Sequence, residues 1–258
     1  DNIKVKGSGS LYHKNWTLYH EGEIWNNGPH GKSVKLRNTR GLVYYSGQMI
    51  NGKKNGTGTI YYNYEKNKIK FSGKFVNDGF HGKNCKIYTE EETLEYAGGI
   101  LEGSKEGPGI EYFEDGKIWY KGEFVNNQRT CFNALIYNPN GELMYEGALL
   151  NNKKHGFGKL FDSQTYTHRY EGQFENDMPH GASGTHYNRE NGNCEYFGSF
   201  VNGQRQGWGK EFHQNGNLAC EGEFSDGQAS GKNLKLYDSK GRLEYSGEVV
   251  GRYKQGKG

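Results

Sequence analysis

The chain has 258 residues, of which 33 are Lys or Arg and 30 are Asp or Glu, so the formal net charge is only +3. This near balance gives no electrostatic footprint for nucleic acid, and we predict no nucleic-acid partner. No apolar run approaches the ~18 residues that a membrane-spanning helix needs, so we expect no transmembrane segment. Hydrophobic residues make up only 32% of the chain, but the 20 Tyr and 13 Phe indicate that aromatic rings are its buried material.

Residues 1–18 read as the second strand of a hairpin whose first strand is absent, because Gly7-Ser8-Gly9 is followed by Leu11-Tyr12. From residue 20 onward one pattern recurs about every 25 residues. It consists of an aromatic residue, any residue, a glycine, any residue and an apolar pair, followed by a turn rich in Asn and Asp. The glycines of the ten copies are Gly22, Gly47, Gly73, Gly98, Gly122, Gly147, Gly172, Gly198, Gly222 and Gly247.

A second glycine follows the first after nine residues in every copy but the fifth, where Cys131 takes its place. These second glycines are Gly31, Gly56, Gly82, Gly107, Gly156, Gly181, Gly207, Gly231 and Gly256. The last copy ends soon after its first strand, 245–250. We therefore expect one continuous array over residues 1–258, with nine full repeats and a half repeat at each end.

Each copy is expected to be a hairpin of two short antiparallel strands. In an extended strand Tyr145, Gly147 and Leu149 share one face, because side chains alternate with period two. Residues 151–154 are turn formers, and residues 156–161 provide a second extended run. A glycine inside a strand marks the close approach of another group, and we expect an aromatic ring from a neighbouring repeat to fill the space above it. A helix is excluded because the 41 glycines would interrupt every turn.

This pattern resembles the MORN repeat (membrane occupation and recognition nexus), and the resemblance covers essentially the whole chain. The departures are Cys131 in place of a glycine, and Cys220 and His20 in place of the leading tyrosine. The resemblance implies an all-β fold: an elongated single-sheet antiparallel β-meander of about ten MORN-type hairpin repeats.

The copies alternate at a third glycine. It is present in alternate copies, at Gly58, Gly109, Gly158 and Gly209. In the others a small polar residue replaces it, at Ser33, Asn84, Asn133, Ser183 and Asn233. Either the array descends from two kinds of repeat with no structural consequence, or alternate hairpins have different surroundings, such as a bend or a partner.

The residue three positions after the first glycine is apolar in eight of the ten copies, although it should lie on the face opposite the glycine. These residues are Trp25, Ile50, Val76, Leu101, Val125, Leu150, Val201 and Val250. A single-layer sheet should be polar on one face, so something is expected to cover this row. We favour the second strands and turns of the array itself, with a partner as the alternative.

No group of residues suggests catalysis, and we predict neither an enzyme nor a cofactor. Four histidines precede second glycines, at His30, His81, His155 and His180. Because Asn, Glu, Thr, Gln and Ser occupy the same position elsewhere, a polar residue that closes the turn explains them better than a metal site. Basic strips occur at Lys66, Lys68 and Lys70 and at Lys32, Lys35, Arg37 and Arg40. We interpret them as a solvated face, with anionic lipid or an acidic protein as the alternative.

The MORN resemblance implies a non-catalytic protein-interaction scaffold, located in the cytoplasm as a structural component of a cytoskeletal or ciliary assembly. The alternative is a regulatory or membrane-associating region of a larger lipid-kinase-like or methyltransferase-like protein. The partner is expected to be a long or multivalent protein or a large assembly, with weak contact to anionic lipid as a further possibility. Its predicted anchors are the rings beside the first glycines, namely Tyr96, Tyr120, Phe124, Tyr145, Tyr170 and Phe174. Alternatively, these rings only pack against the glycines of the array.

Overall fold

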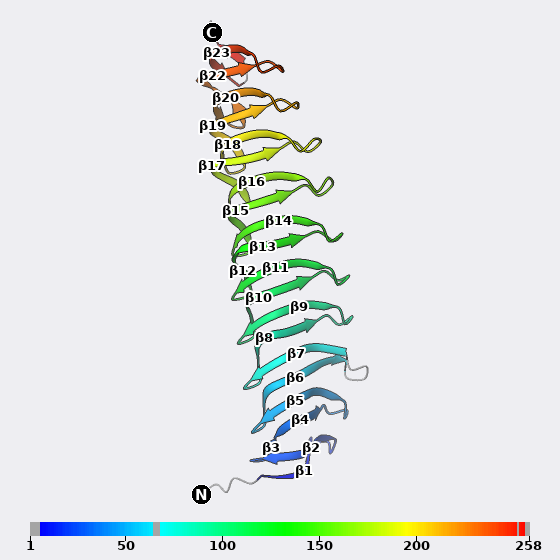
Figure 1. The fold of residues 1–258 in the computed structure, drawn as a ribbon. Helices are drawn as coiled ribbons and strands as arrows, with labels where there is room; N and C mark the ends of the chain where they lie inside the picture. The colour runs from blue at the N-terminus through cyan, green and yellow to red at the C-terminus, as the bar shows by residue number, and fades with distance from the viewer. Residues whose placement is uncertain (1–5, 64–67, 252, 256–258) are drawn as a thin grey trace. The chain divides into compact units, whose positions relative to one another are not determined.

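The structure is a computed structural model that describes residues 6–63, 68–251 and 253–255, so Lys66 and Gly256 lie outside the described residues. The chain divides into two compact units, residues 1–128 and 129–258. In the described residues every regular element is a β-strand and none is a helix (Figure 1). The predicted all-β fold of successive antiparallel hairpins is therefore confirmed. That the two units continue one array stays a prediction.

The first unit contains eleven strands that follow one another in chain order. They are β1 (Lys6–Tyr12), β2 (Leu18–Trp25), β3 (Gly28–Pro29), β4 (Gly31–Arg37), β5 (Val43–Ile50), β6 (Lys53–Asn63), β7 (Lys68–Val76), β8 (Gly79–Tyr88), β9 (Leu94–Leu101), β10 (Ser104–Tyr112) and β11 (Ile118–Val125). From β4 to β11 each strand pairs antiparallel with the next. The two-residue strand β12 (Gln128–Arg129) falls on the boundary between the units.

The second unit repeats this arrangement. Its strands are β13 (Cys131–Tyr137), β14 (Leu143–Leu150), β15 (Lys153–Phe161), β16 (His168–Glu175), β17 (Met178–Tyr187), β18 (Cys194–Val201), β19 (Gln204–Phe212), β20 (Leu218–Ser225), β21 (Gln228–Ala229), β22 (Gly231–Tyr237), β23 (Leu243–Val250) and β24 (Tyr253–Gln255). The 24 strands exceed the twenty that nine full repeats and two half repeats imply, because the last copy also forms a short second strand, β24, and three second strands are broken, into β3 and β4, β12 and β13, and β21 and β22.

The expectation of one sheet is wrong at its beginning, where β1, β2 and β3 form a separate three-stranded sheet. In the second unit β20 pairs with β22 through Cys220 and Leu236, which bridges the equivalent break. No pairing of this kind joins β2 to β4 in the described residues.

A tight turn joins the two strands of each hairpin, and its residues follow from its backbone conformation. Asn151 and Asn152 have φ angles of 51° and 68°, as a type I′ turn requires. Asn, Asp and Gly tolerate this region best, which explains why they fill these turns. Successive turns are also hydrogen-bonded to each other: Asn152 N donates to Arg129 O at 2.9 Å, and Arg129 N donates to Asn152 Oδ1 at 2.8 Å.

The core lies on the face that carries the first glycines, which we call the inner face. The Tyr145 ring lies along its own strand, and its hydroxyl donates to Ala148 O at 2.8 Å. A Cβ added at Gly158, the glycine paired with Gly147, would lie 2.7 Å from two ring carbons of Tyr145. In the copies led by tyrosine, the occupant of the space above the first glycine is thus the ring two residues earlier in the same strand, whereas Leu234 fills the space above Gly222, which follows Cys220. The expectation of a ring from a neighbouring repeat is wrong, because the tyrosine reaches back over its own hairpin.

Phenylalanine rings connect these tyrosines into a ladder. Tyr170 packs edge-on against Phe174 at 5.0 Å between ring centroids, and against Phe200 of the next copy at 5.2 Å. Tyr145 meets Phe174 in the same way at 5.5 Å. Each ring contact of this geometry adds ~0.5–1.5 kcal/mol beyond the area it buries. Stability within a unit is therefore expected to depend on contacts between neighbouring hairpins.

The alternation of copies has a structural consequence. In β13, Cys131 pairs with Leu149 and Ala134 with Gly147, so three steps on one strand oppose two on the other. The same β-bulge occurs in β4, β8, β17 and β22. It occurs in the copies without the third glycine, and it places Val34, Cys85, Ala134, Gly184 and Leu234 opposite the first glycine of the next strand. The second strand is therefore bulged in every other copy, so the surface opposite the inner face differs between neighbouring copies.

Candidate interaction surface

The structure buries all six of the predicted anchor rings. Exposed fractions are 0% for Tyr96 and Tyr120, 1% for Phe124, Tyr145 and Tyr170, and 3% for Phe174. The hydroxyls of the four tyrosines donate to carbonyls of their own strands, for example Tyr96 to Gly99 O at 2.8 Å. A partner could reach these rings only if the sheet opened. The alternative, in which the rings pack against the glycines of the array, describes their geometry in the chain itself.

Burial also disfavours ionisation of the tyrosines on the inner face. It raises the pKa of Tyr45, Tyr170 and Tyr196 to about 12. At neutral pH the hydroxyls remain protonated and act as hydrogen-bond donors. Cations cover several of the rings: Lys105 Nζ lies 4.8 Å from the centroid of Tyr96 and forms an ion pair with Glu111 Oε1 at 2.5 Å. These groups act together to seal the inner face.

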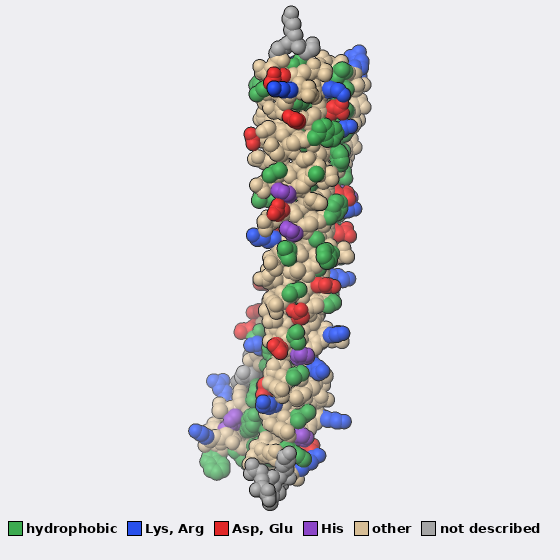
Figure 2. All heavy atoms as spheres, turned by 90° about the vertical axis from the view of Figure 1, so that its left-hand side faces the viewer, with side chains coloured by type: hydrophobic (Ala, Val, Ile, Leu, Met, Phe, Trp, Pro, Cys, Tyr) green, Lys and Arg blue, Asp and Glu red, His purple; other side chains and the backbone are tan. Residues whose placement is uncertain are grey.

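The opposite face, which we call the outer face, carries the row of apolar residues that follows the first glycines. Exposed fractions are 48% for Leu101 and 44% for Leu150, whereas the adjacent inner-face residue Leu149 is 4% exposed. Five further members of the row are 38–52% exposed, namely Ile50, Val76, Val125, Val201 and Val250. The expectation that the chain's own second strands and turns cover this row is therefore wrong. Figure 2 shows the edge with the tight turns, where hydrophobic side chains recur between charged ones.

Recesses lie on the outer face where bulged strands pass beside this row. One recess is lined by Gly82, Lys83 and Asn84 of β8, by Leu101 and by Pro108. A second is lined in the same way by the β22 residues 231–233, by Val250 and by Trp208, and it also contains Glu223 and Glu248. The bulge opens the surface because its extra residue is not paired across the sheet. The recesses therefore recur at equivalent places in the two units.

Three exposed rings of the second unit were missed by the sequence reasoning. Phe132, Phe157 and Trp208 are 87%, 58% and 51% exposed. A signal was present for two of them: Phe157 lies between Gly156 and Gly158, and Trp208 lies between two glycines in the same way. Because the third glycine faces inward beneath a tyrosine, the residue before it must face outward. These rings widen the apolar part of the outer face.

Of the four histidines that precede second glycines, His30 closes a turn, and that turn belongs to the next hairpin, whereas His180 Nδ1 has no hydrogen-bond partner among the described residues. His30 Nδ1 accepts a hydrogen bond from Asn51 N at 3.3 Å. Thr130 Oγ1 accepts from Asn151 N at 3.1 Å, and Glu106 and Gln206 act in the same way. A shared hydrogen-bonding role accounts for the mixture of residues at this position. The described residues contain no group of three or more His, Cys, Asp or Glu side chains placed to hold a metal ion.

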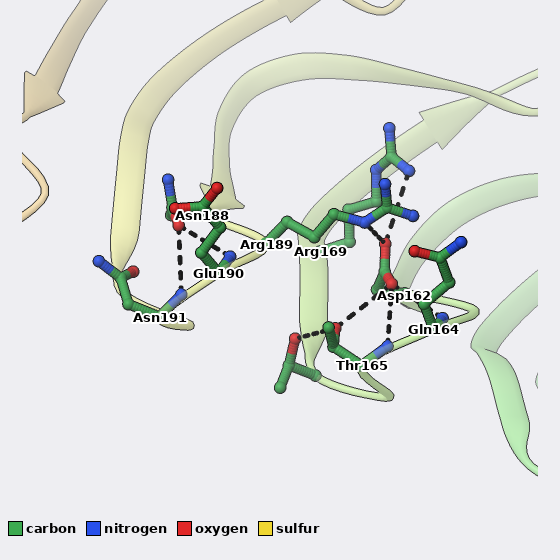
Figure 3. A network of polar contacts seen from close by, with 9 residues as sticks. Asp162, Gln164, Thr165, Arg169, Asn188, Arg189, Glu190 and Asn191 are labelled. Atoms are coloured by element: carbon green, nitrogen blue, oxygen red, sulfur yellow. Dashed lines mark hydrogen bonds and ion pairs between the residues drawn. The ribbon is translucent and has the colours of Figure 1, made fainter.

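The most buried carboxylate outside the tyrosine ladder organises a loop of the second unit (Figure 3). Asp162, 2% exposed, accepts hydrogen bonds from Gln164 N at 2.9 Å and Thr165 N at 3.1 Å. Its other oxygen lies 2.7 Å from Arg189 Nε. The backbone N–H of Gln164 is the largest of the influences that lower the pKa of Asp162 to about 2, and Arg189 adds to them. Figure 3 also draws a hydrogen bond from the Thr165 hydroxyl at 3.3 Å and a longer contact with Arg169, so the carboxylate has a structural role.

The comparisons with known proteins agree with this geometry. The family model described as MORN repeat matches residues 45–63, 96–118, 120–130, 145–165, 170–182, 196–218 and 220–232. A search of curated proteins found no match. No helix in the described residues is long and apolar enough to cross a membrane. MORN repeats are modules that interact with proteins or membranes, and the family is typically non-catalytic. With seven matched repeats, and tyrosine and glycine packed alike in successive hairpins, the chain belongs to the MORN-repeat family.

Proposed function

We propose that this protein is a non-catalytic scaffold that holds an extended segment of a protein partner along the outer face of its hairpins. The observation that carries the proposal is the row of half-exposed aliphatic side chains, one for most hairpins, at the same place in each strand. Isolated exposed hydrophobics are common, but regular repetition on one face is typical of an interaction surface. Many equivalent weak contacts along one partner would together give a useful affinity.

The membership in the MORN family supports a setting for this scaffold. We place it in a cytoskeletal or ciliary assembly of the cytoplasm, where a long or multivalent partner is available. The buried rings Tyr96, Tyr120, Phe124, Tyr145, Tyr170 and Phe174 support binding indirectly, because they fix the strands that carry the outer row. The residues that contact a partner directly are the exposed ones that follow a buried inner-face residue in the sequence, such as Leu150 after Leu149.

The test is site-specific photo-crosslinking in the cells from which the protein comes. A benzophenone amino acid is placed at Leu150 and, as a matched control, at Leu243, which is 56% exposed at the opposite end of its strand. The proposal expects crosslinks to a cytoskeletal or ciliary protein from position 150 and not from position 243. Equal crosslinking at both positions, or a Leu101→Ser/Leu150→Ser variant that retains all its partners and its location, would refute it.

A further inference from the structure

Charge is strongly segregated within the first unit, although the whole chain is nearly balanced. Residues 31–86 contain twelve Lys or Arg and two acidic residues, Glu65 and Asp78, which gives this segment a net charge of +10. Residues 87–128 contain three Lys and ten acidic residues. A local excess of this size produces a field that attracts or repels charged partners, even where the total charge is small.

Six lysines of the basic segment lie on the outer face and define what we call the basic face. They are Lys32 and Lys35 of β4, Lys53 of β6, Lys74 of β7, and Lys83 and Lys86 of β8. All six are exposed. Among the described residues no ion pair involves any of them, whereas Lys54, next to Lys53, lies 3.7 Å from Asp78. Their charge is therefore directed to solvent.

The register of the sheet gives these lysines a regular spacing. Lys35 pairs with Ser46, and the row continues through Thr59 and Ser72 to Lys86. Four strand intervals separate Lys35 from Lys86, which corresponds to roughly 19 Å. Lys32 and Lys83 each follow the second glycine in the bulged strands β4 and β8. The basic face thus carries two equivalent lysine pairs, two hairpins apart, and the alternation of copies sets their separation.

Apolar side chains accompany the lysines. Ile50 and Val76 are 49% and 38% exposed, and they lie at the tight-turn ends of β5 and β7. Beyond them the recess beside Lys83 is lined by Leu101 and Pro108, and Glu106 is its one acidic lining residue. A ligand of this surface would therefore carry negative charges at regular intervals, with small apolar groups between them.

On the equivalent surface of the second unit the lysines have more acidic neighbours. Lys235, which corresponds to Lys86, lies 3.0 Å from Glu221 Oε1, and Lys210 lies 3.6 Å from the other oxygen of the same carboxylate. Lys232, which corresponds to Lys83, lines a recess together with Glu223 and Glu248. The free positive charge is thus a property of the first unit and not of the repeat pattern itself.

We propose that the basic face binds an acidic, extended segment of a protein partner, with carboxylate clusters roughly six residues apart to match ~19 Å between the lysine pairs. The proposal rests on the scaffold function proposed above and names the chemistry of its partner. Charge complementarity favours such a segment because no ion pair in the described residues involves the six ammonium groups, although Glu106 lines the recess beside Lys83. A membrane surface is the weaker choice, because residues 31–86 present none of the large exposed rings that anchor proteins at lipid interfaces in their described part.

The test uses the full chain and a fluorescein-labelled peptide that has Glu-Glu pairs six residues apart with valine and threonine between them. Its controls are a peptide of the same composition with the four glutamates adjacent, and vesicles with and without anionic lipid. The variant Lys83→Glu/Lys86→Glu is compared with Lys14→Glu/Lys240→Glu, which changes the net charge equally at exposed loop lysines. Thermal melting of each variant verifies that it folds.

We expect the spaced peptide to bind, and Lys83→Glu/Lys86→Glu to weaken its binding about tenfold or more, since two attractions become repulsions. The loop variant should change its binding by less than about twofold, and added salt should weaken it. Equal binding of the two peptides, equal losses in the two variants, or binding of anionic vesicles without binding of the peptide would overturn the proposal. The scaffold function is judged separately, by the outcome at Leu101 and Leu150.

Discussion

The contact between Tyr145 and Gly158 allows a sharp test of how the inner face is packed. The change is Gly158→Ala, because the three atoms nearest to the added Cβ all belong to the Tyr145 ring. The methyl group cannot enter unless the ring leaves its position over the two glycines. The expected loss of stability therefore approaches that of removing the ring itself, ~3–5 kcal/mol for a buried aromatic residue changed to Ala.

A double-mutant cycle separates this clash from any general effect of the substitution. In a Tyr145→Ala background the space above Gly158 is empty, so Gly158→Ala should cost far less, with a coupling of about 2 kcal/mol or more. Gly147→Ala is the matched control, because a Cβ there would meet the backbone Cα of Gly158 as well as the Tyr145 hydroxyl. Removing the tyrosine should not rescue that variant.

Hydrogen exchange resolved along the chain is the appropriate assay, because an array of hairpins need not unfold in one step. We expect protection to fall in β14, β15 and β16 and to change much less in β22 and β23. Additive effects of Tyr145→Ala and Gly158→Ala would refute the ring-over-glycine account. Uniform loss of protection along the second unit would refute the nearest-neighbour account.

Three further results are expected. Leu150→Ser should change the free energy of unfolding by less than ~0.5 kcal/mol, whereas the same change at its buried neighbour Leu149 should cost several kcal/mol; urea denaturation compares them. The folded pKa of Asp162 is about 2 and lies below the ordinary 3.8, so its carboxylate should stabilise the loop above about pH 4. In thermal melting, the advantage of wild type over Asp162→Asn should therefore vanish as the pH falls toward 2. Asp177→Gly keeps the positive φ of 73° but removes the acceptor of the Lys154 N–H, so thermal melting should show a loss of ~1 kcal/mol.

Much of the fold could be predicted from the sequence because the repeat makes each local signal visible ten times. The first strands, the tight turns and the inward direction of Tyr145, Gly147 and Leu149 all follow from period-two alternation and turn chemistry. The identity of the ring above each glycine did not follow. A tyrosine on the same strand and one on a neighbouring repeat give the same sequence pattern, and only the hydrogen bond from Tyr145 to Ala148 O shows which is present.

The surface was harder to predict than the core. Alternation placed Leu101 and Leu150 on the face opposite the glycines, but it could not show whether other strands covered that face. Their half exposure depends on the path of the second strands, which the β-bulges control. The six rings predicted to contact a partner were selected because they are aromatic, but in this array aromatic rings pack the inner face of the sheet. Phe157 and Trp208, by contrast, were identifiable from their position between two glycines.

The two faces of these hairpins are under different physical constraints, and this difference indicates where specificity can reside. On the inner face a tyrosine covers two glycines, so almost any substitution there displaces a ring. On the outer face Lys83, Phe132 and Ala182 occupy equivalent bulge positions with different charge and size. The array tolerates such variation because these side chains project into solvent and take no part in the tyrosine ladder. Under the scaffold function proposed above, a partner would be selected by outer-face residues that the repeat pattern leaves unconstrained, and the lysines of residues 31–86 are the most distinctive of these.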